Sequence, residues 1–131
     1  MWAAGPCCNE FPQVLMNSFA KESGMLDEKF DEIMRSYYAS LEAELKAAGK
    51  ECNYPYDTFI ADLRLNLVDM WLSYCGFSAG AMDGYKKPEL KVQAEQWRML
   101  MQRNMQTLHS CGCAEALEKF AEEAGLWSAQ A

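Results

Sequence analysis

The segment from Asp57 to Phe77 constrains the fold more than any other part of this sequence. Its large apolar residues recur at spacings of three and four, which places them on one broad face of a helix: Phe59, Ile60, Leu63, Leu67, Met70, Trp71, Tyr74 and Phe77. Leu65, Val68 and Leu72 fall on a second side. A helix that is apolar on two sides needs neighbours on two sides, so we expect it to be the central helix of a bundle.

A second strong helical pattern precedes it, from Asp27 to Ala48. Asp27 can cap this helix, and its first turns are acidic, which the positive end of the helix dipole favours. Gly49 follows where a left-handed C-terminal cap is expected. A shorter helix is predicted upstream, from Asn9 to Ser23. The apolar stripe of the Asp27–Ala48 helix comprises Phe30, Ile33, Met34, Tyr37, Tyr38, Leu41 and Leu45.

Glycines predict the end of the central helix. Gly76, Gly80 and Gly84, with Ser78 and Asp83 between them, favour a bend or a wide turn over a continued helix. The central helix is therefore expected to end near residue 77, and the chain is expected to reverse before the next helix begins.

Two further helices are expected after this turn. Pro88 fits the first position of a helix that runs to about Ser110 and is stopped by Gly112. A last helix covers residues 114–124, with Gly125 as its cap. The buried side of the Pro88–Ser110 helix is expected to comprise Leu90, Trp97, Leu100, Met101 and Leu108, with Ala94 and Met105 adjoining.

The chain has no alternating period-two stretch bounded by hairpin turns and no internal repeat. The sequence therefore predicts an all-α fold: a single-domain bundle of four to six helices over residues 1–131, around a central helix near residues 57–77. Residues 1–10 are expected to be an irregular N-terminal segment, and residues 126–131 a C-terminal tail.

Charge and hydropathy exclude several classes of function. A net charge of −7 argues against binding to a phosphate backbone, which needs clustered Lys and Arg. No apolar run approaches the roughly 20 residues that span a bilayer. The first ten residues lack the basic start and the apolar segment of a secretory signal peptide. We expect an intracellular, cytoplasmic or organellar protein without a transmembrane span; peripheral association with a membrane complex stays open.

Six cysteines allow either thiols or a metal site. They lie among helices that have enough apolar residues to fold without disulfides, so reduced thiols are expected. The pairs Cys7-Cys8 and Cys111-x-Cys113 together offer four thiolates to a metal. This arrangement lacks the C-x-x-C spacing typical of zinc sites, so ordinary thiols are the favoured interpretation and no metal site is assigned.

Catalytic motifs are missing from the sequence. There is no G-x-S-x-G elbow, no G-x-x-x-x-G-K-[ST] phosphate loop and no G-x-G-x-x-G after a strand. His109, the only histidine, lies beside Cys111 and Cys113, but no orienting Asn or Asp is predictable nearby. A surface or partly buried histidine near a helix C-terminus explains it better. We therefore assign no catalytic, cofactor-binding or metal-binding residue and predict that the protein is not an enzyme.

The ends of the chain carry the residues that point to a partner. Trp2 and Trp127 lie near the termini without a helical neighbour, and large aromatic residues in such places often serve an interface. Leu126 precedes Trp127 and either folds back or docks on a partner. Trp2, Leu126 and Trp127 are the candidate partner-binding residues.

Four stretches resemble a known family. They are GPCCNEFPQVLMNSF at Gly5–Phe19, FDEIMRSYYASLEAELKAAG at Phe30–Gly49, YPYDTFIADLRLNLVDMW at Tyr54–Trp71 and RNMQTLHSCGCAEAL at Arg103–Leu117. Their order resembles the C-terminal helical part of the choline/aminoglycoside-phosphotransferase-like kinases, particularly the ecdysteroid-kinase-like branch. The resemblance covers most of the chain and consists of helical patterns.

What the resemblance implies is mainly an absence. In that family catalysis depends on a nucleotide-binding lobe, an HGD-x-x-x-x-N loop and a D-[WFY]-Q segment. Here Ser110 and Cys111 follow His109, and Met1-Trp2-Ala3 lacks the Asp, so no catalytic residue carries over. Phosphoryl transfer without such groups and Mg²⁺ is expected to be negligible.

The sequence thus favours a non-catalytic helical interaction or scaffold protein, an accessory subunit of a larger and possibly membrane-bound assembly that binds protein partners. Its apolar surface would be one that a lost kinase lobe once covered. The alternative is a substrate-binding helical fragment of a small-molecule phosphotransferase. A third interpretation is a pigment- or cofactor-binding helical protein, in which His109 or Met and Asn side chains serve as axial ligands, although no spacing demands it.

Overall fold

The computed structural model describes residue 15, residues 25–82 and residues 86–126. These residues form four α-helices: α2 (Met25–Ala47), α3 (Tyr56–Met82), α4 (Lys91–Ser110) and α5 (Cys113–Glu123). A 3₁₀ turn, η3 (Pro88–Leu90), leads into α4. The described part of the chain contains no strand, which confirms the predicted all-α fold. The helix predicted for residues 9–23 lies outside the described residues, apart from Leu15.

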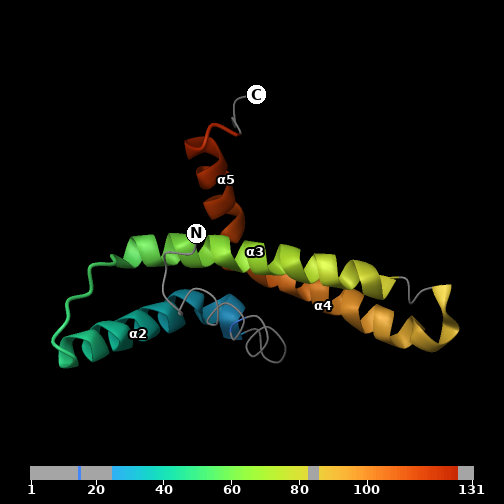
Figure 1. Ribbon diagram of the computed structural model, residues 1–131, viewed down its shortest axis with the longest axis horizontal. Coiled ribbons are helices and arrows are strands. Elements are labelled where there is room, and N and C mark those ends of the chain that lie inside the picture. The colour runs from blue at the N-terminus through green and yellow to red at the C-terminus, as the bar shows by residue number, and fades with distance from the viewer. Residues whose placement is uncertain (1–14, 16–24, 83–85, 127–131) are drawn as a thin grey trace.

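The helices are arranged around α3, as predicted for a helix with neighbours on two sides (Figure 1). α4 runs antiparallel beside α3, and α2 lies along the other end of α3. α5 rises from the opposite side of α3, away from α2 and α4. Among the described residues, no helix combines the length and the apolar content that a membrane span requires.

The core lies where α2, the first half of α3 and the α4–α5 junction meet. Residues spaced by four put one stripe of α2 into it, and the predicted face of α3 supplies the other side. Leu15 is also fully buried there. The buried members of the core are Leu26, Phe30, Met34 and Tyr38 of α2, Phe59, Ile60, Leu63 and Leu67 of α3, and Leu108, Cys111 and Cys113 at the junction.

Tyrosines fix the connection between α2 and α3. The Tyr38 hydroxyl donates a hydrogen bond to the carbonyl oxygen of Tyr54, and the Tyr54 hydroxyl donates to the Asp62 carboxylate. The ring of Phe59 lies 5.6 Å from that of Tyr38 and 6.2 Å from that of Tyr56, between centroids. Buried aromatic pairs at such distances add about 0.5–1.5 kcal/mol beyond their area, so this cluster holds the α2–α3 loop against the core.

The predicted glycine cap of α2 is confirmed. Gly49 has a φ of +70°. Its backbone N–H donates to the Lys46 carbonyl over 3.0 Å, and the Lys50 N–H donates to the Leu45 carbonyl over 2.9 Å. These two bonds form a Schellman motif, which satisfies carbonyls that the end of the helix leaves without partners.

The predicted bend near residue 77 is wrong. α3 continues through Gly76 and Gly80 to Met82 without interruption. Glycine lowers helix stability by about 1 kcal/mol per residue, but it adopts helical dihedral angles without strain. The extra turns of α3 run beside α4 (Figure 1), so tertiary packing outweighs the local preference. The reversal falls after Met82 instead.

The predicted buried side of α4 is correct in part. The helix follows a 3₁₀ turn that begins at Pro88, and Ala94, Met101 and Leu108 are buried as expected. The prediction that Leu90 and Met105 are buried is wrong, because they are 38% and 51% exposed. Among the described helices, α4 packs mainly against α3, so one side of α4 is left less covered than in a central bundle helix. Trp97 and Leu100 are half-buried.

Candidate interaction surface

α5 is a short amphipathic helix whose apolar side extends beyond the core. It begins after Gly112, whose φ of +77° lies in the left-handed region, and it covers eleven residues. Cys113 at its start is buried, but further along the same side Leu117 is 44% and Phe120 is 48% exposed. Its glutamates lie on the opposite side, at helical spacing. The apolar stripe of α5 is therefore covered only at its base.

α3 contributes a second apolar stripe to the same region. Phe59, Leu63 and Leu67 point to the core, so the residues half a turn away lie on the outward side of α3. α5 packs on α3 at its base and rises from this side (Figure 1). The residues of this outward stripe are Leu65, which is half-buried, Val68, which is half-buried and also packs against the buried core, and Leu72, which is 56% exposed.

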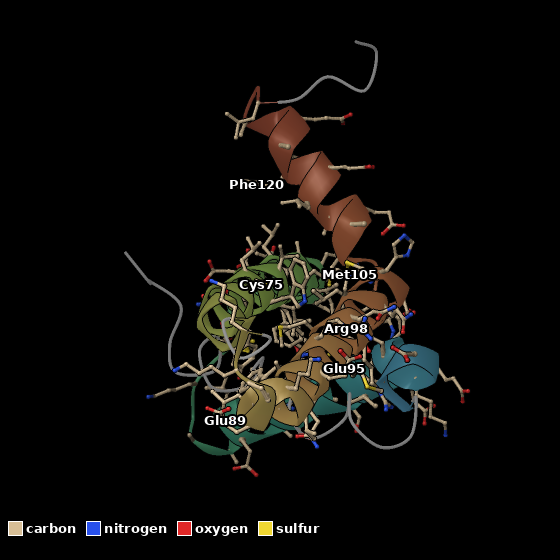
Figure 2. All side chains as sticks on the ribbon, turned by 90° about the vertical axis from the view of Figure 1, so that its right-hand side faces the viewer. Cys75, Glu89, Glu95, Arg98, Met105 and Phe120 are labelled. Atoms are coloured by element: carbon tan, nitrogen blue, oxygen red, sulfur yellow. The ribbon has the colours of Figure 1, made fainter. Side chains whose placement is uncertain are left out.

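Together these stripes form a surface that we call the α3–α5 corner, defined by Leu65, Val68, Leu72, Leu117 and Phe120. In Figure 2, Phe120 lies on the flank of α5 above α3. Exposed apolar patches bordered by polar residues are typical of interaction sites. Both stripes belong to regular helices, so the corner presents side chains at fixed positions.

Leu126 extends the corner at its far end. The Gly125 N–H donates to the Glu122 carbonyl over 3.0 Å, and the Leu126 N–H donates to the Ala121 carbonyl over 2.8 Å. This is a second Schellman motif, which fixes the backbone of Leu126. Its side chain is 78% exposed and does not fold back on the core. The candidate partner-binding residues Trp2 and Trp127 lie outside the described residues.

Arg64 connects α3 to the base of α5. Its Nε donates to the carbonyl oxygen of Cys111 over 2.8 Å, and its guanidinium lies 5.5 Å from the centroid of the Phe30 ring. A Cβ added at Gly112 would lie 3.3 Å from the guanidinium. The 3.9 Å pair with Asp31 is exposed and contributes little. Arg64 and Gly112 therefore set the direction in which α5 leaves the bundle.

The two thiols of the α4–α5 junction, Cys111 and Cys113, are buried. Burial raises the pKa of both Cys111 and Cys113 to about 12, so they stay protonated near neutral pH. His109 is exposed in the last turn of α4, as predicted. Within the described residues, no three His, Cys, Asp or Glu side chains are placed to share a metal ion. Cys7 and Cys8 lie outside them.

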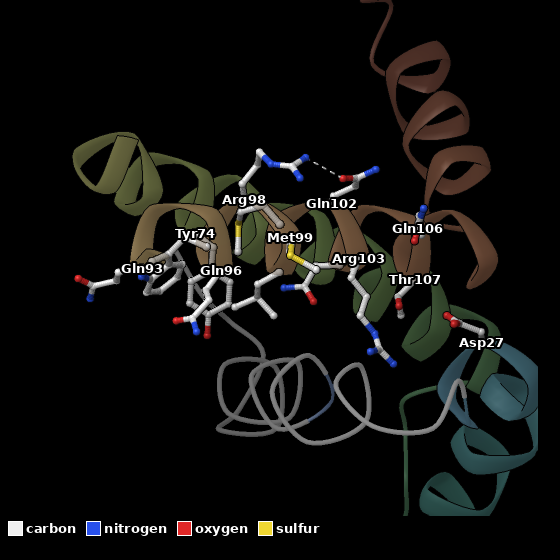
Figure 3. Close-up of a pocket in the computed structure, with 14 residues that line it drawn as sticks. Asp27, Tyr74, Gln93, Gln96, Arg98, Met99, Gln102, Arg103, Gln106 and Thr107 are labelled. Atoms are coloured by element: carbon white, nitrogen blue, oxygen red, sulfur yellow. Dashed lines mark hydrogen bonds between the residues drawn. The ribbon is translucent and has the colours of Figure 1, made fainter. Parts of the chain in front are cut away.

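A second feature is a cavity of about 1080 Å³ along one side of α4 (Figure 3). Tyr74 and Gln93 lie at one end of it, and Thr107 and Asp27 lie at the other. Asn104 also lines it. This side chain is 2% exposed, and its Oδ1 accepts no hydrogen bond. A buried oxygen without a donor costs about 1–3 kcal/mol, so the cavity has one polar atom that a bound donor would satisfy.

The residues that matter most in both places do not stand out in the sequence. Leu117 and Phe120 belong to a stripe that periodicity assigns to a core, and periodicity does not say what covers a stripe. Asn104 follows Met101 by three positions on the buried side of α4, and from this helical spacing its burial could have been predicted. Leu126 is the one candidate partner-binding residue that the described part of the chain contains.

No protein-family model, curated protein or solved structure matches this chain. The resemblance to the helical part of the phosphotransferase-like kinases therefore stays a prediction.

Proposed function

We propose that this protein is a non-catalytic helical interaction protein that binds another protein through the α3–α5 corner, as an accessory subunit of a larger assembly. The observation that carries the proposal is the exposure of large apolar side chains on two helices that pack together: Leu72, Leu117 and Phe120 are 44–56% exposed. Covering such side chains contributes roughly 25 cal/mol per Å² of apolar surface.

A pair of double variants tests this function. Leu117→Gln/Phe120→Gln removes the apolar side chains of α5 while keeping a good helix former. Val92→Gln/Met99→Gln is the matched control, because Val92 and Met99 are 72% and 59% exposed on α4, outside the corner. Proteins captured by the native chain from its source are quantified by mass spectrometry for each variant, after circular dichroism has shown that both variants keep the helical content of the native chain.

We expect one captured protein to be lost with Leu117→Gln/Phe120→Gln, by tenfold or more, and kept with the α4 control. Tenfold corresponds to about 1.4 kcal/mol, which is modest for two buried anchor residues. Equal capture by both variants, or a native chain that migrates as a monomer with nothing bound, contradicts the proposal.

The second candidate function is the substrate-binding helical fragment of a small-molecule phosphotransferase. The α4 cavity favours it, because its volume suits a small molecule and Asn104 offers an unsatisfied acceptor. Calorimetry of the native chain with choline and with an aminoglycoside, the substrate classes that the resemblance suggests, separates the two candidates. A scaffold protein gives no heat of binding, whereas saturable binding that is weakened by Asn104→Leu favours the phosphotransferase fragment.

A further inference from the structure

We infer that the α4 cavity binds a zwitterionic small molecule with an apolar body, of the class that α-amino acids with large apolar side chains represent. This inference goes beyond the proposed function, because it assigns a ligand class to the cavity and does not depend on the α3–α5 corner. It is carried by three polar groups at one end of the cavity and by the apolar wall along α4.

The first polar group is the side chain of Asn104. It lines the cavity and is 2% exposed, and its Oδ1 accepts no hydrogen bond within the described residues. A buried acceptor without a donor costs about 1–3 kcal/mol, and an ammonium N–H is a stronger donor than a neutral one. A ligand with an ammonium group at this end therefore satisfies an atom that the chain leaves without a partner.

The other two groups are opposite charges at the same end of the cavity. Arg103 of α4 and Asp27 of α2 both line this end (Figure 3). Both are exposed, and neither forms an ion pair within the described residues. Arg98, another cation of the lining, is already paired with Glu95 over 2.5 Å. A guanidinium binds a carboxylate with two parallel hydrogen bonds, so Arg103 suits a ligand carboxylate and Asp27 suits its ammonium group.

An apolar wall continues from these groups along α4. Trp97, Leu100 and Met101 precede Asn104 by seven, four and three positions, so they lie on the same side of the helix. All three line the cavity, and Tyr74 of α3 lies at its far end (Figure 3). From Trp97 to Asn104 the helix rises by about 10 Å. An apolar ligand body that extends from the polar end therefore contacts this wall.

Ligands of other charge leave part of the polar end without a partner. An anion places its oxygens against the Asp27 carboxylate and the Asn104 acceptor, whereas a cation without a carboxylate leaves Arg103 unpaired. Unpaired charges and desolvated polar groups discriminate against the wrong ligand. A molecule with both charges on neighbouring atoms avoids each of these costs.

Three molecules that share a phenyl ring test this inference. L-phenylalanine carries both charges, phenethylamine lacks the carboxylate and hydrocinnamate lacks the ammonium group. Binding of each molecule to the full chain is measured by calorimetry near neutral pH. We expect L-phenylalanine to bind at least tenfold more tightly than either analogue, and tenfold corresponds to about 1.4 kcal/mol.

Variants of two exposed residues locate the binding. Arg103→Gln should weaken binding of L-phenylalanine about tenfold and leave phenethylamine unchanged, whereas Asp27→Asn should weaken L-phenylalanine and leave hydrocinnamate unchanged. Lys91→Gln is the matched control for charge, because Lys91 is exposed on α4 outside the cavity, and it should change neither.

A variant of the buried residue tests the third contact. Asn104→Leu should weaken L-phenylalanine about tenfold, after circular dichroism has shown that the helical content is kept. If this variant does not fold, Arg103→Gln and Asp27→Asn decide the test, because both replace exposed side chains.

Several outcomes overturn the inference. They are equal binding of all three molecules, no binding of L-phenylalanine, and binding that survives both Arg103→Gln and Asp27→Asn. Binding of choline without binding of L-phenylalanine contradicts a zwitterionic ligand and favours the phosphotransferase fragment. Leu117→Gln/Phe120→Gln should bind L-phenylalanine as the native chain does, so a failure at the cavity leaves protein binding at the α3–α5 corner intact.

Discussion

At the scale of single residues, two thiols depend on the packing of the α4–α5 junction. Cys111 and Cys113 are 2% and 1% exposed, and the Cys111 sulfur lies 4.0 Å from the carbonyl oxygen of Leu26. Removal from water disfavours a thiolate, and it raises the pKa of each from 9.0 to about 12. These thiols therefore act as small apolar residues in the core.

Burial predicts an order of alkylation and a loss of stability in base. With iodoacetamide at pH 8, peptide mapping should show the half-buried Cys52 and Cys75 labelled before Cys111 and Cys113, which should be labelled only as fast as the chain unfolds. The folded pKa of both exceeds the unfolded value, so the unfolded state binds fewer protons above pH 9. The free energy of unfolding should thus be unaffected by these thiols below pH 9 and should fall as the pH rises toward 12.

The control for this prediction is Cys111→Ala/Cys113→Ala. The variant loses core packing at every pH, but its stability should fall less steeply between pH 9 and pH 11 than that of the native chain. Early labelling of Cys111 or Cys113 would show that the junction opens without global unfolding.

Gly112 is predicted to be more sensitive than the other left-handed glycines. Ala at φ +77° costs about 1–2 kcal/mol, and the same cost applies to Gly49→Ala at φ +70°. Gly112→Ala also displaces Arg64 from its hydrogen bond to Cys111, whereas an added Cβ at Gly49 meets nothing within 4 Å. Urea denaturation should therefore show about 1 kcal/mol more destabilisation for Gly112→Ala. Equal losses would mean that the Arg64 contact contributes nothing.

At the scale of secondary structure elements, the length of α3 is the main departure from the sequence prediction. Gly76 lies inside the helix, and a Cβ added there meets no atom within 4 Å. Gly76→Ala should therefore stabilise the protein by about 0.5–1 kcal/mol, measured by urea denaturation. If α3 ended at this glycine, the substitution would give no gain or would destabilise the chain.

Most helix boundaries were predictable because their signals are local. Gly49 ends α2, Pro88 starts the turn that leads into α4, and Gly125 ends α5. The predicted cap at Asp27 is wrong, because α2 begins at Met25 and Asp27 lies inside its first turn, before a non-helical residue at Lys29. The end of α3 was not predictable, because packing against α4 overrides the glycines. The set of buried residues on α4 was not fully predictable either, because tertiary packing covers two polar side chains: Asn104 and Thr107 are both 2% exposed.

At the scale of the whole molecule, the sequence predicted a partner surface but not its position. It named Leu126, which the structure leaves exposed, and it assigned the remaining stripes to a core. Whether a stripe is covered depends on the direction of α5, which no local pattern encodes. The positive charge of α4 and the negative charge of α5 can be read from the sequence, but the surfaces that these charges border depend on how the two helices are placed.

The junction at Gly112 makes α5 a lever. One left-handed residue and one arginine contact set its angle, and the helix extends for about 16 Å beyond that point. A rotation of about 10° at the base would displace the tip, near Leu126, by roughly 3 Å. A displacement of this size breaks side-chain contacts, in which heavy atoms lie within about 4–4.5 Å of one another. Gly112 and Arg64 at the base of α5 therefore determine which partners fit the corner, although a partner bound in the corner need not contact either residue.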